Sequence, residues 1–298
     1  MRVHSCSFVA INRESIMSVN TLKTAALLGL LSAVLIVGGG AISGRGGMYI
    51  GLTLAVVMNF SSYFFSDKIA LMSYAAQPVS ESQNPEIYRR VAPIVRNLCQ
   101  RMGLPMPKLW IIPEDSPNAF ATGRNPAHAS VAFTSGILRI MDDREIEGVV
   151  AHELGHVLHR DILISSVAAT LAAAITLLAR LTFWFGGSSR DNEEGGGVFG
   201  ALAMMILAPI AAMLIQMAIS RSREYDADAA SAKYTGTPYE LISGLQKLET
   251  YSQRLPMQAT PSTAHLFIIK PKLGLGLGNL FSTHPPTEER IRRLQAMR

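Results

Sequence analysis

Two histidines four residues apart, with a glutamate directly after the first, form the pattern in this sequence most suited to chemistry. The segment reads His152-Glu153-Leu-Gly-His156. On an α-helix, residues four apart share a face, so both imidazoles can bind one zinc ion while Glu153 lies beside them. A carboxylate in that place can serve as the general base for a metal-activated water. The motif therefore predicts a zinc hydrolase with His152 and His156 as metal ligands and Glu153 as the catalytic base.

A catalytic zinc site needs a third protein ligand and keeps one position for water. A nearby third histidine is not expected, because His159 stands where the longer His-x-x-Gly-x-x-His pattern requires glycine. Glu224 is the best candidate, and Asp228 lies one helical turn later on the same face. Asp228 would accept a hydrogen bond from the outer nitrogen of a ligating histidine. The alternative is that residues 221–228 are a charged membrane flank with internal ion pairs.

The elements that must position these residues include four long apolar runs. Only 16% of the residues are charged, whereas soluble domains have about 25%. A membrane-spanning helix needs about 20 apolar residues, and each run is close to that length. The first two runs, 24–44 and 46–66, form one predicted hairpin, with Gly46-Gly47 as its turn. The last two, 162–185 and 195–220, form a second hairpin. The alternatives are buried core helices and, for the first run, a cleaved signal peptide.

The basic residues flank these runs, which is typical of membrane orientation rather than of a nucleic-acid surface, despite a net charge of +5. Their distribution places both termini and the segments that carry the chemistry in the cytoplasm, and no nucleic-acid partner is expected. The two cysteines cannot make a disulfide framework or a structural metal site. Because the second apolar hairpin leaves after His156 and returns before Glu224, it would bring Glu224 back to the level of the histidines.

Two polar stretches, 67–161 and 221–298, remain for a cytoplasmic domain, and residues 1–23 form an N-terminal extension. Asp142 and Glu145 have the spacing of a capping box at the start of the HExxH helix. Other local signals predict helices at 85–101 (ended by Gly103), 221–234, from 237 and from 287, with strands at 108–112 and 131–133. The predicted fold is a mainly α membrane protein with four transmembrane helices and an α+β domain.

Five motifs in order resemble the HtpX-type membrane metalloproteases, bacterial relatives of the CAAX-prenyl proteases. They occupy residues 103–108, 117–125, 152–156, 220–228 and 281–285. The resemblance implies a gluzincin-like HExxH protease domain with one zinc ion per chain. It also implies hydrolysis of damaged or misfolded membrane proteins, or other unfolded polypeptides, at the cytoplasmic face of the bacterial inner membrane. The lipid bilayer is then the second partner.

The same resemblance assigns roles that the residues alone do not. Asn118, Ala119 and Phe120 would form a substrate-binding edge strand, although by themselves they favour a turn. His284 and Arg290 would stabilise the oxyanion. Two other functions stay open at this point: a membrane scaffold or transporter with a structural zinc, and a narrow peptidase for prenylated peptides.

Overall fold

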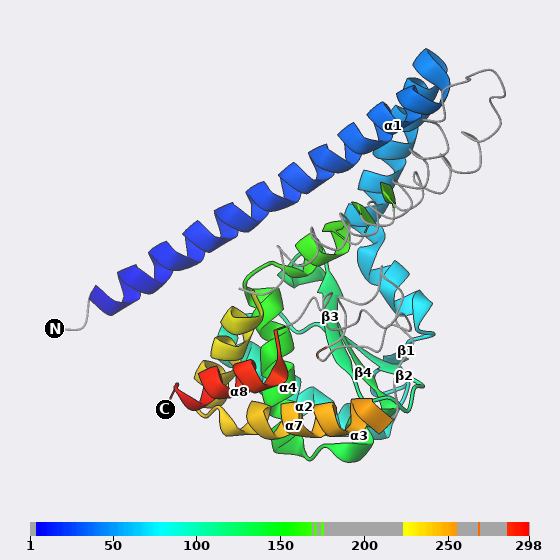
Figure 1. The fold of residues 1–298 in the computed structure, drawn as a ribbon. Helices are drawn as coiled ribbons and strands as arrows, with labels where there is room; N and C mark the ends of the chain where they lie inside the picture. The colour runs from blue at the N-terminus through cyan, green and yellow to red at the C-terminus, as the bar shows by residue number, and fades with distance from the viewer. Residues whose placement is uncertain are drawn as a thin grey trace.

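The computed structural model of the chain describes residues 4–168, 170–171, 174–175, 223–254, 268 and 285–297. Figure 1 shows a long two-armed helix, α1 (His4–Ser73), that projects from a globular part. The globular part combines a four-stranded sheet with several helices. Among the described residues the chain is mainly helical, as predicted, and the α+β domain is present.

The two arms of α1 meet at Ser43 and Gly44, which leave the helical region of backbone space. Gly44 has φ 56 and ψ −140, a conformation that suits only glycine. The predicted turn at Gly46-Gly47 was therefore wrong, since both residues are helical. Gly47 instead allows the arms to pack closely, because a Cβ atom on Gly47 would collide with the Gly39 carbonyl group.

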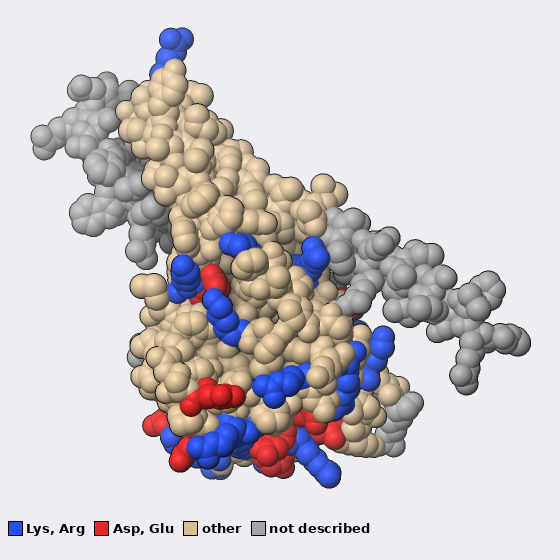
Figure 2. Space-filling view, turned by 180° about the vertical axis from the view of Figure 1, so that it is seen from behind, with Lys and Arg blue, Asp and Glu red and all other residues tan. Residues whose placement is uncertain are grey.

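Two helices within α1, Asn20–Ala41 and Ser43–Ser73, are long and apolar enough to cross a membrane. Only 17% of each apolar window is buried within the molecule, so most of these side chains face outward. Figure 2 shows the charged side chains gathered on the globular part, while the projecting stalk is almost free of them except at its tip and base. The first two predicted spans thus have counterparts, and α1 also includes much of the expected N-terminal extension. The third and fourth runs lie largely outside the described residues.

The sheet contains β1 (Gln77–Val79), β2 (Lys108–Ile112), β3 (Ala119–Gly123) and β4 (Ala129–Thr134) in the order β1-β2-β4-β3. Strands β2 and β4 run parallel, and the other two pairs are antiparallel. The strand predicted at 108–112 is confirmed, and the one at 131–133 lies within β4. Strand β3 is at one end of this order among the described strands, which agrees with the edge strand implied for Ala119 and Phe120, while its role in substrate binding stays a prediction.

Side chains alternate between the two faces of the sheet, as the strand geometry requires. Leu109, Ile111, Val131 and Phe133 belong to the main hydrophobic core, which the helices of the globular part cover. The opposite face carries Ile112, Phe120 and Ala132, which pack against Leu71 near the end of α1. The sheet therefore joins the two-armed helix α1 to the globular core.

Local signals account for the helices of that core. Helix α2 (Pro85–Met102) begins with proline and ends at Gly103, which has φ 65. A short turn η1 (Pro126–His128) and helix α3 (Ser135–Ile140) follow. Helices α4 (Asp143–Leu158), α7 (Tyr239–Arg254) and α8 (Thr287–Gln295) begin within two residues of their predicted starts, and residues 223–235 are also helical.

Candidate active site

Helix α4 carries the HExxH motif, and its first turn is fixed by the predicted capping box. The Asp142 side chain accepts hydrogen bonds from the backbone N–H groups of Arg144 and Glu145, at 2.9 and 3.0 Å. In return, the Asp142 N–H donates to Glu145 Oε2 at 2.9 Å. The helix is buried along most of its length. The capping box thus fixes where α4 begins, and burial holds the helix that carries the histidines against its neighbours.

The helix at 223–235 packs against α4 at Gly155, between the two histidines. A Cβ atom on Gly155 would lie 3.1 Å from Ala227 Cα and 3.1 Å from Ala230 Cβ, closer than ordinary contact. About two turns closer to the start of α4, the Ser231 hydroxyl donates to the Gly148 carbonyl at 2.8 Å. The small residue at position 155 therefore lets the two helices approach closely enough for Glu224 to reach the histidines.

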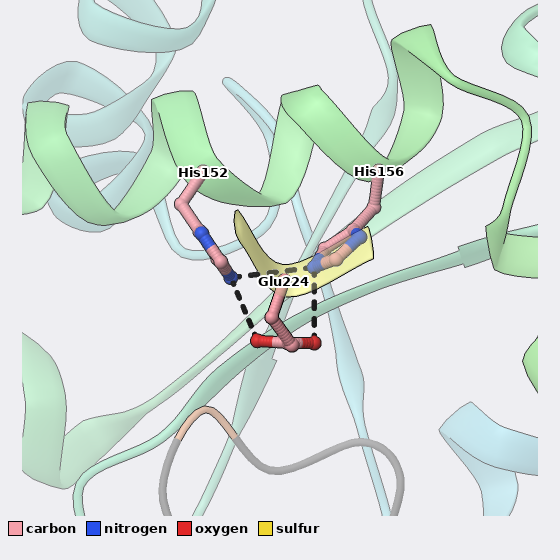
Figure 3. A group of neighbouring side chains, drawn as sticks. All are labelled: His152, His156 and Glu224. Atoms are coloured by element: carbon pink, nitrogen blue, oxygen red, sulfur yellow. Dashed lines mark hydrogen bonds and ion pairs between the residues drawn. The ribbon is translucent and has the colours of Figure 1, made fainter. Parts of the chain in front are cut away.

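His152, His156 and Glu224 converge on one point, as Figure 3 shows. The two Nε2 atoms lie 3.3 Å apart. Glu224 faces both, with Oε2 at 3.6 Å from His152 Nε2 and Oε1 at 3.6 Å from His156 Nε2. The structure thus brings together the three side chains predicted as metal ligands from segments about 70 positions apart in the chain.

The arrangement fits a zinc ion in its donor set and in its orientation. One ligand atom from each of the three side chains lies within 4.8 Å of the others, and two imidazoles with a carboxylate are a usual catalytic zinc set. Both Nδ1 atoms face carboxylates: Asp228 lies 2.9 Å from His152 Nδ1 and Asp161 lies 3.1 Å from His156 Nδ1. An Nδ1–H that donates to a carboxylate leaves the Nε2 lone pair for a metal. The contact predicted between Asp228 and a histidine is confirmed.

Glu153 lies between α4 and the sheet, where it is only 5% exposed. Its Oε2 accepts a hydrogen bond from the Ala121 backbone N–H at 2.8 Å, so the outer edge of β3 faces this carboxylate. Burial raises the pKa of Glu153 to about 7, and the nearby Glu224 acts in the same direction. A carboxyl group with this pKa can both accept and release a proton near neutral pH.

The other charged groups of the site have shifted pKa values with identifiable causes. Burial acts to lower the pKa of His156, but Asp161, Glu224 and Glu153 together raise it to about 9. Burial, followed by the Arg290 charge, lowers the pKa of His152 despite its contact with Asp228. Burial acts against ionisation of Asp228, yet Arg290 and His152 lower its pKa to about 2.

Arg290 is fully enclosed and holds the carboxylate that orients His152. Its Nε and Nη2 atoms donate to Asp228 at 2.9 and 2.6 Å, and Nη1 donates to the Ile268 carbonyl at 3.0 Å. The Nη1 atom also lies 3.7 Å from Glu224 Oε2. These contacts make Arg290 a support of the ligand cluster. Its role at the oxyanion stays a prediction, and His284 lies outside the described residues.

Asn118 directly precedes β3 and forms hydrogen bonds within the protein. It is 3% exposed, and its Oδ1 accepts from the Ile268 N–H at 3.2 Å. The Asn118 N–H donates to Thr134 Oγ1, and the Thr134 N–H donates to the Asn118 carbonyl, both at 2.9 Å. The side chain thus fixes the start of the strand. The assignment of Asn118, Ala119 and Phe120 to substrate binding stays a prediction.

Sequence reasoning missed three residues that build the site: Gly155, Asp161 and Arg223. Gly155 is the glycine inside the HExxH motif and could have been singled out as a close-contact position. Asp161 is an acidic residue at the boundary between a helix and an apolar run, where a charge needs a partner. Arg223 belongs to the basic flank that follows the fourth apolar run, yet it is 8% exposed and donates a hydrogen bond to the Asp161 carbonyl.

Comparisons with known proteins agree with this geometry. The family model for peptidase family M48 matches residues 82–298. A protein named Protease HtpX homolog from Syntrophobacter fumaroxidans is 56% identical over 92% of this chain and 98% of its own length. One of the same name from Burkholderia cenocepacia is 51% identical over 93% of this chain and 97% of its own.

The fold is also similar to that of a solved structure. The crystal structure of S. mikatae Ste24p aligns with a TM-score of 0.53 and 19% identity, over 95% of this chain and 67% of the other. That likeness concerns the fold alone. The sequence matches cover the HExxH motif, the Glu224 segment and most of α1, and the chain belongs to peptidase family M48, among the HtpX-type membrane proteases.

Proposed function

We propose that the chain is a zinc-dependent membrane endopeptidase that hydrolyses peptide bonds of damaged or misfolded membrane proteins at the cytoplasmic face of the bacterial inner membrane. One observation carries the proposal: His152, His156 and Glu224 converge on one point, and the buried Glu153 lies next to them against the outer edge of β3. Family membership supports peptidase activity. The identity of the metal as zinc, the class of substrate and the membrane face are proposed in addition to that activity.

His152, His156 and Glu224 would hold the zinc ion, with Asp228 and Arg290 fixing the orientation of His152. When bound there, zinc would polarise the scissile carbonyl and lower the pKa of water. Glu153 would take the proton of the attacking water and deliver it to the nitrogen of the leaving amine. Its pKa of about 7 in the metal-free site reflects a surrounding that tolerates both protonation states.

Strand β3 is suited to align an extended substrate beside this base. Among the strands that the structure describes it lies at the edge of the sheet, and the Ala121 N–H points away from β4 toward Glu153. An unfolded segment could add as a further strand along this edge, which recognises backbone groups rather than particular side chains. Recognition of this kind suits an enzyme that acts on many damaged proteins.

Metal dependence is tested with the purified protein in detergent. Chelation should abolish cleavage of casein, and added zinc should restore it. Glu224→Ala should lower the zinc content well below one ion per chain, while Glu147→Ala, an acidic residue on the solvent side of α4, should keep it. Wild-type protein that cleaves equally well after complete removal of metal would contradict the proposal.

Glu153→Gln distinguishes the enzyme from a scaffold or transporter with a structural zinc. A structural site has no need of a base between its histidines. The variant should therefore keep its zinc and lose casein cleavage if the protein is a hydrolase. Full cleavage by zinc-loaded Glu153→Gln would exclude the base assigned here.

The membrane face is tested by fusing reporters to the carboxyl terminus. A cytoplasmic terminus predicts fluorescence from a green fluorescent protein fusion and no activity from an alkaline phosphatase fusion. The opposite pair of results would place the site on the other face. Comparison of casein with a prenylated peptide would show whether the specificity is broad, as proposed, or narrow.

A further inference from the structure

Asp161 lies in the turn between α4 and the apolar run that follows, and it contacts the second histidine of the motif. Its Oδ2 atom is 3.1 Å from His156 Nδ1, and the residue is only 1% exposed. A buried carboxylate in this position determines which imidazole nitrogen carries the proton. Asp161 thus contacts Nδ1 of His156 in the same way that Asp228 contacts Nδ1 of His152.

The same residue is bonded to the segment that carries Glu224. Arg223 Nη1 donates to the Asp161 backbone carbonyl at 2.9 Å, and Nη2 donates to the Ser165 hydroxyl at 3.2 Å. Arg223 is 8% exposed and directly precedes Glu224. A guanidinium group with two separate acceptors has a defined direction as well as a position. The contact therefore fixes where the helix at 223–235 begins relative to the end of α4.

The turn that carries Asp161 is itself held in place. The Asp161 N–H donates to the His156 carbonyl at 3.2 Å, and Arg160 adopts a positive φ of 57. From the first membrane helix, the Asn20 side chain donates to the His159 carbonyl at 2.8 Å, and Asn20 is 6% exposed. The turn is thus bonded to three separate parts of the chain, which keeps Asp161 in position beside His156.

We propose that Asp161 and Arg223 form a positioning pair for the metal centre. The Asp161 carboxylate holds His156 with Nε2 toward the metal, and the Asp161–Arg223 bond sets Glu224 at the height where its two oxygens face both histidines. This inference rests on the proposed zinc site and goes beyond the three ligands and Asp228. Neither residue reaches the reacting atoms, so both act through the ligands.

The test compares Asp161→Ala, Asp161→Asn and Arg223→Met with wild type in full-length protein in detergent. Competition with a chromophoric chelator gives the zinc affinity, and the absorption spectrum of the cobalt-substituted protein reports the ligand geometry. Loss of a hydrogen-bond partner of a metal ligand typically weakens metal binding 10–100-fold. Asp161→Ala and Arg223→Met should show such a loss, an altered cobalt spectrum, and a lower kcat with little change in KM.

Two comparisons separate positioning from general damage. Asp161→Asn keeps an acceptor for the Nδ1–H, so its zinc affinity should lie between those of wild type and Asp161→Ala. Glu147→Gln removes a partly exposed carboxylate on the solvent side of α4, where it pairs with Arg101, and should leave the affinity and spectrum unchanged. Thermal unfolding of each metal-free variant shows whether it is folded.

Wild-type zinc affinity and an unchanged cobalt spectrum in both Asp161→Ala and Arg223→Met would overturn the pair. If either variant fails to fold, Asp161→Asn and Arg223→Lys decide, and wild-type affinity in both would equally overturn it. Failure of the zinc proposal itself would be visible in the wild-type protein, which would then neither bind zinc tightly nor lose activity on chelation.

Discussion

Glu145 and Glu153 lie on the same helix, α4, and are nearly equally buried, at 4% and 5% exposure. Their pKa values nevertheless shift in opposite directions. For Glu145, burial acts to raise the pKa, but hydrogen bonds from Lys247, Ser243 and the Asp142 N–H lower it overall. For Glu153, burial dominates and raises the pKa to about 7, although the Ala121 backbone N–H donates a hydrogen bond to it.

The difference teaches that burial alone does not assign a role to a carboxylate. Glu145 accepts from Lys247 Nζ at 2.6 Å, from the Ser243 hydroxyl at 2.6 Å and from the Asp142 N–H at 2.9 Å. Those donors stabilise the ionised form and fix the beginning of α4. Glu153 is held with fewer donors, so its charge is costly and its proton is easily exchanged. One helix thus joins a structural glutamate and a reactive one.

The largest expected effect that tests this comparison is on catalysis. Glu153→Gln should reduce kcat for casein cleavage by about 10²–10⁴-fold, the usual contribution of a general base, without loss of zinc. Glu145→Gln should change kcat by less than about threefold per folded, zinc-loaded molecule, because it acts only on stability. Similar losses of kcat in the two variants would end the distinction between a reactive and a structural glutamate.

The second effect is the pH dependence of stability in the metal-free protein. The pKa of Glu153 is raised from 4.5 to about 7 on folding, so its contribution is fully present below pH 4.5 and is lost as pH rises through 7. Between these two pH values the free energy of unfolding should fall by about 3 kcal/mol. Glu153→Gln lacks the ionisation, so urea unfolding in the presence of chelator should find it more stable than wild type at pH 8. The advantage should disappear near pH 4.5; an advantage that does not depend on pH would contradict the raised pKa.

The third effect is on the stability of the domain. Glu145→Ala removes half of the capping box and takes away the carboxylate that accepts from the partly buried Ser243 and Lys247 side chains. Loss of the cap and of these two hydrogen bonds should together cost about 2 kcal/mol of unfolding free energy. Thermal and urea unfolding in detergent would measure it. Glu147→Ala, on the same helix with a half-exposed partner, Arg101, should cost less than half as much.

Much of this design is predictable from local sequence, because capping and turn signals act within a few residues. The Asp142–Glu145 capping box, the start of α2 at Pro85 and its end at Gly103 all follow from the sequence and are confirmed. The predicted placement of Glu224 near the histidines also agrees with the structure, whereas the apolar hairpin from which it was predicted lies largely outside the described residues. Its role as a metal ligand stays a prediction.

The rest depends on contacts between distant segments, which no local pattern contains. Gly47 looked like a turn residue, but tertiary packing against Gly39 uses its missing side chain instead. Strand β3 has small residues without the usual β-branched alternation, and pairing with β4 makes it a strand. Asp161 and Arg223 are 62 residues apart, and their relation appears only when the helix at 223–235 lies against α4.

The smallest expected effect concerns Lys247, the cation that contacts Glu145 and has no counterpart among the described contacts of Glu153. Lys247 Nζ lies 2.6 Å from Glu145 Oε2, but its side chain is 39% exposed, so solvent weakens the pair. Lys247→Met should cost about 1 kcal/mol of unfolding free energy. Because the pKa of Glu145 is lowered below 4.5 in the folded protein, this cost should be present above pH 4.5 and should vanish as pH falls below that value.

Removing Lys247 makes the surroundings of Glu145 more like those of Glu153, yet kcat should not change, since Glu145 has no metal ligands beside it. A cost that persists in acid would show that Lys247 stabilises the domain through its alkyl chain rather than through the charge on Glu145.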